Sequence, residues 1–236
     1  MAKITWLGQS CFQINVSNGK ENSAVIVIDP FDESIGLKMP RLSADLLLIT
    51  HDHPDHNNIK AVKLASDKTE GGGSFLITGP GEYEIKGIFI EGTPAFHDDV
   101  QGKERGRVTV YTIETEGLRF CHLSDLGQKQ LTDEQMEKIG SVDILMIPVG
   151  GTYTISGQEA TKIVSQIEPK IVIPMHYNLP PHLYYRWGAI KPKLDGLEKF
   201  LKAMGKNSIA PQEKFSVKNN TLPKEGIEIV ILNPHT

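Results

Sequence analysis

The segment THDHPDHNN, at positions 50–58, constrains this chain more than any other, because three His and two Asp stand within six of its residues. It directly follows DLLLI, a short and almost entirely apolar run of the kind found in buried strands. Alternate residues of a tight turn can point the same way, so His51 and His53 can bind one ion. Asp55 and His56 would then face a neighbouring ion, and imidazole with carboxylate suits Zn²⁺, Mn²⁺ or Fe²⁺. The spacing therefore predicts a metal site at the end of a strand.

Further His and Asp residues stand at the ends of other strand-like runs. His97 follows IEGTPAF, His122 and Asp125 follow LRFC, and His176 follows IVIPM. Ends of separate strands are where a β-scaffold can assemble a metal site. Structural alternatives stay open: the first cluster can be a solvated turn or a helix cap, His97 and Asp125 can be caps, and His176 can be a hydrogen-bonded core residue.

Hydrophobic alternation and turn residues predict a series of short strands in the first half, mostly paired antiparallel. A helix is expected over 57–66, where NNIKAVKLAS has helical spacing. The strands are expected at 4–8, 11–16, 24–30, 45–50, 74–78, 82–86, 88–96, 107–114 and 118–124.

The second half changes to strands that alternate with helices. Capping signals predict two helix starts, at Thr132 with Gln135 and at Ser156 with Glu159. The remaining elements are expected as strands at 143–149 and 171–176, a third helix at 194–205, and a closing strand pair at 213–217 and 227–232.

Composition narrows the class of protein. A length of 236 residues without a Pro/Ser-rich divider fits one domain, 1–236, and a net charge of −4 gives no basic field for nucleic acid. The two Cys, Cys11 and Cys121, lack CxxC spacing, so a reducing cytosol is expected and a disulfide between them is not favoured. No apolar run approaches the ~20 residues that cross a bilayer, and the first residues lack a signal-peptide core. The expectation is a cytoplasmic protein with no membrane partner.

HDHPDH, with His97, Asp125 and His176 later in the chain, resembles the metallo-β-lactamase-fold hydrolase superfamily. Asp29 closes AVIVIDP as an early structural Asp does in that superfamily. PVGGTYTISGQEA, at 148–160, is similar to the Gly-rich segment of its ascorbate-phosphate-lactonase-like and simple β-lactamase-like branches. The resemblance covers nearly the whole chain. It implies an α/β fold, an αββα sandwich in which two mixed β-sheets pack face to face with helices outside.

The same resemblance implies a cofactor of two divalent metal ions per chain, with Zn²⁺ first and Mn²⁺ or Fe²⁺ open. The first ion would be held by His51, His53 and His97. The second would be held by Asp55, His56 and His176, with Asp125 bridging both. Asp29 would brace the ligand loop through hydrogen bonds, and His122 would stand behind the ligands or in the pocket.

Such a site predicts a hydrolase in which a metal-bridged hydroxide attacks a small, anionic ester, lactone or phosphoester. Asp55 or Asp125 would orient the hydroxide, and His182 is a candidate proton donor. Selectivity is expected from the loop 178–192, whose candidates for an aromatic wall and an anion anchor are Tyr184, Tyr185, Arg186 and Trp187. An equal alternative is a loop that folds its own aromatics onto the surface. The charged loop 98–107 can also clamp an anion, but a solvated loop is the favoured interpretation.

Two other functions stay open. One is a nuclease or phosphodiesterase of the same superfamily that acts on RNA or nucleotides, against which the acidic net charge and the lack of a long insertion count. The other is a non-catalytic, metal-stabilised binding protein, which predicts bound metal without hydrolysis. The expected partner is a small-molecule substrate, and a homo-oligomer stays open because no feature of the sequence identifies an interface.

Overall fold

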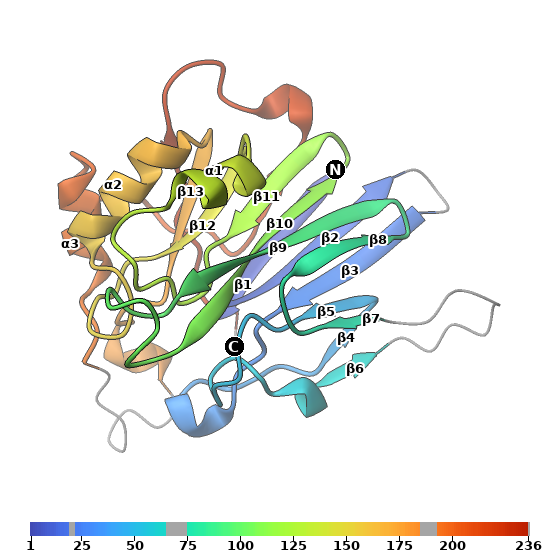
Figure 1. The fold of residues 1–236 in the computed structure, drawn as a ribbon, viewed down its shortest axis with the longest axis horizontal. Coiled ribbons are helices and arrows are strands. Elements are labelled where there is room, and N and C mark those ends of the chain that lie inside the picture. Colours follow the sequence, from blue (N-terminus) through green and yellow to red (C-terminus); the bar gives the residue numbers. More distant parts are fainter. Residues whose placement is uncertain (19–21, 65–74, 185–192, 236) are drawn as a thin grey trace.

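Two β-sheets stacked face to face form the centre of the computed structural model, which describes residues 1–18, 22–64, 75–184 and 193–235 (Figure 1). The described strands of the first sheet, in spatial order, are β14 (Phe215–Val217), β1 (Ala2–Gly8), β2 (Cys11–Asn18), β3 (Asn22–Ile28), β5 (Leu46–Leu48) and β7 (Phe75–Ile77). Those of the second sheet are β15 (Glu228–Ile229), β13 (Ile171–Met175), β12 (Ile144–Pro148), β11 (Leu118–His122), β10 (Arg107–Thr115), β9 (Ile88–Phe96) and β8 (Gly81–Ile85).

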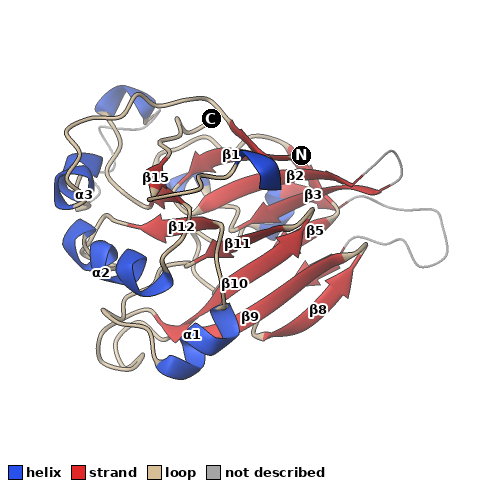
Figure 2. Cartoon of the chain, turned by 90° about the horizontal axis from the view of Figure 1, so that it is seen from above, coloured by secondary structure: helices blue, strands red, loops and turns tan. Residues whose placement is uncertain are grey.

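The α-helices of the described chain lie along one side of this stack (Figure 2). α1 (Asp133–Ile139) packs against β9, α2 (Gly157–Ile167) packs against β12, and α3 (Leu197–Ala203) packs on α2. A small parallel pair, β4 (Leu42–Ala44) with β6 (Val62–Leu64), lies beside the first sheet. Short 3-10 turns complete the described elements: η1 (Glu33–Ile35), η2 (Ile59–Ala61), η3 (Pro181–Leu183) and η4 (Asn219–Thr221). The arrangement confirms the predicted α/β sandwich of two mixed sheets.

Burial explains why these segments are strands. Along β1 buried and partly exposed side chains alternate at first, as expected for a strand with one face on the core. Every residue of β12 and β13 is buried, and α2 packs against β12. Trp6, Phe12, Tyr111 and Phe120 are among the large side chains that fill the core.

Both predicted capping boxes are present. The side chain of Thr132 accepts a hydrogen bond from the N–H of Gln135, that of Ser156 accepts one from the N–H of Glu159, and each bond is reciprocated. None of the helices in the described part of the chain has the length and apolar character needed to cross a bilayer.

Several pairings differ from the prediction. The prediction of a helix over 57–66 is wrong in its described part. That part contains η2 followed by β6, whose residues Val62–Leu64 pair with β4. The sequence misleads here because a short apolar run fits a helix or a strand equally well. The expected closing pair is also wrong, since β14 pairs with β1 in the first sheet and β15 pairs with β13 in the second. Antiparallel pairing holds for β1–β3 and β8–β11, whereas β5 and β7 join the first sheet in parallel. In each case the true partner is distant in the sequence.

Candidate metal centre

Seven His and Asp side chains meet where four strands end. They are His51, His53, Asp55 and His56 after β5, His97 after β9, Asp125 after β11, and His176 after β13. β5 belongs to the first sheet and the other three strands belong to the second, so the cluster spans both sheets. All seven residues proposed as ligands from the sequence are thus brought together.

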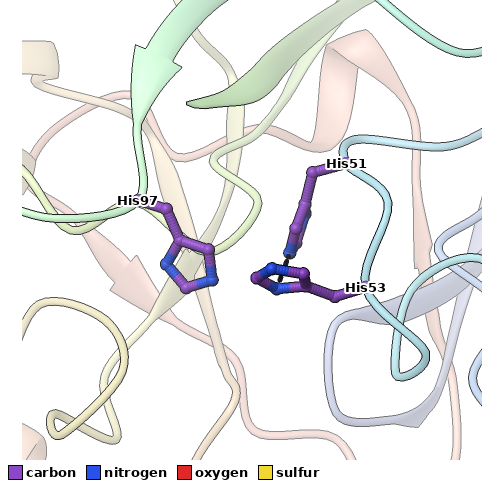
Figure 3. Close-up of side chains that lie close together, drawn as sticks. All are labelled: His51, His53 and His97. Carbon is purple, nitrogen blue, oxygen red and sulfur yellow. Dashed lines mark hydrogen bonds between the residues drawn. The ribbon is translucent and has the colours of Figure 1, made fainter. Parts of the chain in front are cut away.

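His51, His53 and His97 form the first group of this cluster (Figure 3). Nε2 of His51 lies 3.0 Å from Nδ1 of His53. The ring centroid of His97 lies 5.0 Å from that of His51 and 5.1 Å from that of His53. One potential ligand atom from each residue lies within 4.8 Å of the others, so the three rings can share one divalent cation.

Asp55, His56, Asp125 and His176 form the second group, and Asp125 stands between the two groups. Its Oδ2 lies 3.1 Å from Nε2 of His176, 3.2 Å from Nε2 of His56 and 3.6 Å from Nε2 of His97. Oδ2 of Asp55 lies 3.6 Å from Nε2 of His56, and this side chain remains 29% exposed. Asp125 is therefore the carboxylate that two neighbouring cations could share, while Asp55 faces the open side.

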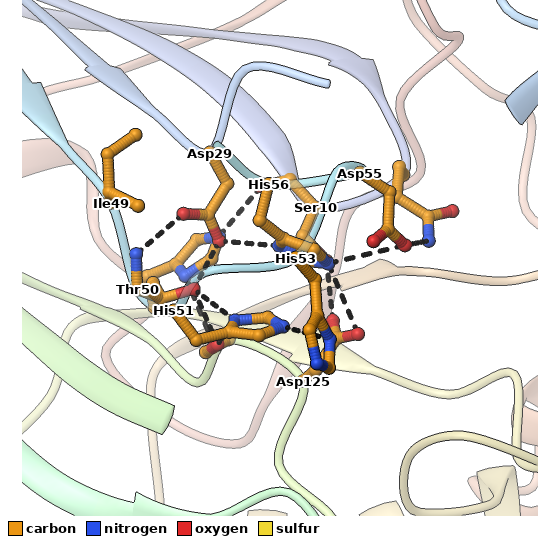
Figure 4. A network of polar contacts seen from close by, with 12 residues as sticks. Ser10, Asp29, Ile49, Thr50, His51, His53, Asp55, His56 and Asp125 are labelled. Carbon is orange, nitrogen blue, oxygen red and sulfur yellow. Dashed lines mark hydrogen bonds and ion pairs between the residues drawn. The ribbon is translucent and has the colours of Figure 1, made fainter. Parts of the chain in front are cut away.

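Asp29, directly after β3, supports the ligand loop from behind (Figure 4). Its buried carboxylate accepts hydrogen bonds from the N–H of Thr50 at 2.8 Å, from the hydroxyl of Thr50 at 2.6 Å and from Nδ1–H of His56 at 2.9 Å. The bond to His56 orients the ring so that Nε2 faces Asp125. This is the bracing position predicted for Asp29 from the sequence.

The hydroxyl groups behind His51 determine which of its ring nitrogens carries a lone pair that could bind a metal. Thr50 gives its only hydroxyl proton to Asp29 and accepts one from Oγ of Ser124 at 2.7 Å. The 3.0 Å contact between Oγ1 of Thr50 and Nδ1 of His51 must therefore use a proton on Nδ1. Nε2 of His51 then carries a lone pair directed at His53. Burial, aided by His56, lowers the pKa of His51 to about 3, so this ring is neutral at physiological pH.

The charges around the second group favour a cation. Burial alone would lower the pKa of His56, but the carboxylates of Asp125 and Asp29 outweigh it and raise that pKa well above its ordinary value. Burial would likewise raise the pKa of Asp125, yet His176 and His56 hold it well below its ordinary range. A divalent cation among these groups would be stabilised by the same carboxylates.

The backbone around the cluster is unusually constrained. Four non-glycine residues, Gln9, Asp29, Ser124 and His176, adopt left-handed conformations with φ between +50° and +54°. Such conformations cost free energy and concentrate at functional sites. Gly150 permits a close approach here, because a Cβ at this position would lie 2.1 Å from the carbonyl oxygen of His176. The Gly-rich segment seen in the sequence therefore lets His176 pack against the end of β12.

Two adjoining cavities open beside the cluster. The first, of about 450 Å³, lies over the ligands and is also lined by Arg105 and Tyr153. The guanidinium carbon of Arg105 lies 5.8 Å from the ring centroid of Tyr153. The second cavity, of about 290 Å³, adjoins the first, since Asp55 and Tyr153 line both. Most of its wall is apolar or aromatic: Ile35, Leu37, Tyr177, Leu179, Tyr184 and Leu194.

Of the residues predicted to donate a proton or bind substrate, Tyr184 lines a cavity and His182 does not. His182 is exposed in η3 and lines neither cavity. Tyr184 lines the second cavity, where its hydroxyl accepts a hydrogen bond from the N–H of Leu179 at 3.2 Å. The other candidates of this loop lie outside the described residues: Tyr185, Arg186 and Trp187.

His122 is fully buried behind the ligands and does not reach the cavities. Its Nε2 donates to the carbonyl of Ser10 at 2.9 Å, and its Nδ1 accepts from the N–H of Ser124 at 3.1 Å. Cys11 and Cys121 are buried free thiols, as the sequence favoured.

The turn between β1 and β2 contacts the cluster in a way that the sequence analysis missed. Oγ of Ser10 donates to Oδ1 of Asp125 at 3.1 Å. Nε2 of Gln9 lies 2.9 Å from Oδ2 of Asp55 and 2.7 Å from Nε2 of His176. Ser is an ordinary turn residue, and Gln9 belongs to no motif, so no feature of the sequence distinguishes them.

Comparisons with known proteins find relatives along most of the chain. The family described as Beta-lactamase superfamily domain matches residues 3–176. The UPF0173 metal-dependent hydrolase of Thermococcus onnurineus is 32% identical over 200 residues, which cover 77% of this chain and 87% of that protein. A UPF0173 metal-dependent hydrolase of Staphylothermus marinus is 34% identical over 201 residues, with coverage of 75% and 84%.

A crystal structure of similar fold extends the likeness to the C-terminal part. It is that of a proposed Zn-dependent hydrolase of the metallo-β-lactamase superfamily from Thermotoga maritima, 33% identical to this chain. The TM-score is 0.73, and the match covers 98% of each chain.

Proposed function

Because the chain belongs to the β-lactamase superfamily, we propose that it is a metal-dependent hydrolase with two divalent cations at the cluster. The observation that carries the proposal is the convergence of seven ligand atoms in two groups that meet at Asp125. One cation would be held by His51, His53 and His97, and the other by Asp55, His56 and His176, with Asp125 shared. Zn²⁺ is the first candidate, and Mn²⁺ and Fe²⁺ suit the same ligands.

The residues around the cluster have separate roles in this proposal. Bound divalent cations lower the pKa of water and stabilise negative charge that develops on an electrophile. Asp55 lies where the two cavities meet, so its carboxylate can accept a hydrogen bond from the attacking water and orient it. Neither Cys11 nor Cys121 serves as a nucleophile, because burial raises the pKa of both thiols and keeps them protonated.

The two cavities support a small substrate with an anionic part and an apolar part. Arg105, 36% exposed, offers a positive charge beside the ligands; its guanidinium lies over the ring of Tyr153 and 3.7 Å from the carboxylate of Glu104, which lines the same cavity. The ester, lactone or phosphoester bond would lie over the cluster with the anionic group near Arg105. The apolar part would then enter the second cavity, whose volume of about 290 Å³ suits a small acyl or aryl group.

The first test is hydrolysis by protein loaded with Zn²⁺, Mn²⁺ or Fe²⁺. Probe substrates are p-nitrophenyl esters, a lactone, a thioester and bis(p-nitrophenyl) phosphate. Hydrolysis that requires the metal supports the proposal. Bound metal without turnover of any probe would favour the non-catalytic binding protein instead.

His53→Ala is expected to reduce turnover of a responsive probe by at least about a hundredfold, because the first group loses one of its nitrogen ligands. The side chain of His53 is partly exposed, so the circular dichroism spectrum should match that of the wild type. Wild-type turnover in this variant would exclude the first cation from the reaction.

Arg105→Ala is expected to raise KM for an anionic ester roughly fivefold and to leave KM for a matched neutral ester unchanged, since the half-exposed charge is partly screened. p-Nitrophenyl hemisuccinate and p-nitrophenyl butyrate form a suitable pair. Lys103→Ala is the control, because Lys103 is exposed in the same loop and lines neither cavity. Equal changes for both esters would remove Arg105 as an anion anchor.

A further inference from the structure

Gln9 contacts two of the proposed ligands of the second cation. Its Nε2 lies 2.9 Å from Oδ2 of Asp55 and 2.7 Å from Nε2 of His176. Both acceptor atoms belong to the second group of the cluster. We infer that Gln9 competes with the second cation, because its amide must release Nε2 of His176 before that atom can bind a metal.

The chemistry of the Gln9 amide determines which atom of each contact donates the hydrogen bond and which accepts it. Nε2 of Gln9 carries two hydrogens and accepts none, so it donates to both partners. In the tautomer of His176 that accepts from this amide, Nε2 holds a lone pair, and the carboxylate of Asp55 offers another. A lone pair that accepts a hydrogen bond from the amide cannot bind a cation at the same time. Nε2 of His176 has a single lone pair, so at this atom the amide and the second cation exclude each other, whereas the carboxylate of Asp55 keeps further lone pairs.

The backbone of Gln9 is fixed while its side chain has space to move. Its carbonyl accepts hydrogen bonds from Nε1–H of Trp6 at 3.0 Å and from the N–H of His176 at 3.1 Å. Its φ of +51° is a conformation that few residues other than glycine adopt, and it belongs to the turn that directs the side chain at the cluster. Gln9 also lines the second cavity, so rotation of its side chain suffices to release the ligands.

The competition affects the two cations unequally. Among the described residues, no hydrogen bond joins the side chain of Gln9 to His51, His53 or His97. The first cation is therefore bound more tightly, and the second exchanges more readily. Gln9 then sets the metal concentration at which the second position fills.

A Zn²⁺ titration of metal-stripped full-length protein against a chromophoric chelator measures both dissociation constants. Gln9→Ala is expected to lower the second constant about tenfold, which is 1.4 kcal/mol, and to leave the first unchanged. Gln9→Met keeps the length of the side chain but lacks the amide donors, so it should lower the second dissociation constant to a similar extent. Because Met fills the same space, this variant separates competition from a folding defect. Gln13→Ala is the matched control, because the amide of Gln13 bonds to Asn15 within β2, and it should bind Zn²⁺ as the wild type does.

The inference rests on the two-cation site of the proposed function, and the outcomes separate the two. A wild type that binds no Zn²⁺ refutes that function and the competition with it. A wild type that binds two Zn²⁺, with equal or weaker second binding in both Gln9 variants, overturns the competition alone. One Zn²⁺ in the wild type and two in the variants would support the competition, whereas one in every protein would overturn it.

Discussion

Asp125→Asn is expected to reduce metal-dependent hydrolysis at least about a thousandfold and to leave less than one tightly bound cation per chain. Asp125 faces both ligand groups, because its Oδ2 lies within 3.6 Å of ring nitrogens from His56, His97 and His176. Asn keeps the size of the side chain, but the negative charge is lost and one terminal atom becomes a donor without a lone pair. Elemental analysis and turnover at saturating Zn²⁺ measure the two effects.

Asp52→Asn is the control for this experiment. Asp52 belongs to the same HDHPDH segment, but it is exposed and stands outside both ligand groups. Its metal content and turnover should stay within about twofold of the wild type, as expected for a surface substitution. If Asp125→Asn instead retained two cations and full turnover, Asp125 would not be a shared ligand.

Asp29→Ala is expected to lower the free energy of unfolding by about 3 kcal/mol and to weaken Zn²⁺ binding roughly 10–100-fold. The carboxylate is fully buried and accepts three hydrogen bonds, from two groups of Thr50 and from His56. Alanine leaves these buried donors without an acceptor and frees the ring of His56 to rotate. Denaturant unfolding of metal-stripped protein measures the first effect, and a Zn²⁺ titration measures the second.

Asp45→Ala separates a bracing role from general destabilisation. Asp45 accepts hydrogen bonds from the N–H of Val25 and from Nζ of Lys86, both at 2.8 Å, and it precedes β5 whereas the ligand loop follows that strand. Its loss should cost about 1 kcal/mol and leave Zn²⁺ affinity unchanged. Wild-type Zn²⁺ affinity in Asp29→Ala would show that the ligand loop keeps its shape without this carboxylate.

The cluster could be predicted because its pattern is local. HDHPDH occupies six consecutive residues directly after an apolar run, and the other proposed ligands also follow strand ends. Gln9 and Ser10 carry no such pattern. They reach the cluster only because the turn between β1 and β2 lies against His176, whose N–H bonds to the carbonyl of Gln9.

Strands were easier to predict than their partners. Alternation and apolar runs show which residues can be buried, but they do not show which neighbouring strand covers them. β14 and β15 illustrate this limit, because each looks like an ordinary closing strand in the sequence and each joins a different sheet. Their partners, β1 and β13, are chosen by the packing of the whole sandwich.

The charged loop 98–107 shows how one residue can organise a segment whose composition suggests a solvated loop. The carboxylate of Asp98 accepts hydrogen bonds from four backbone N–H groups, those of Val100, Gly102, Glu104 and Arg105. The loop is therefore an ordered turn that carries Arg105 to the wall of the first cavity. Most of its side chains are exposed, as expected for a solvated loop, but charge content does not show which backbone groups a single Asp can bind.

The proposed ligands lie on loops of both sheets, so a bound cation would cross-link two layers that are otherwise held together by apolar packing and hydrogen bonds. A ligand that binds only the folded state adds about 2.7 kcal/mol to the free energy of unfolding when its concentration is a hundred times its Kd. The melting temperature should therefore rise with each metal in the order of its affinity. Melting curves can therefore rank the metals by their affinity for the cluster before any substrate is known.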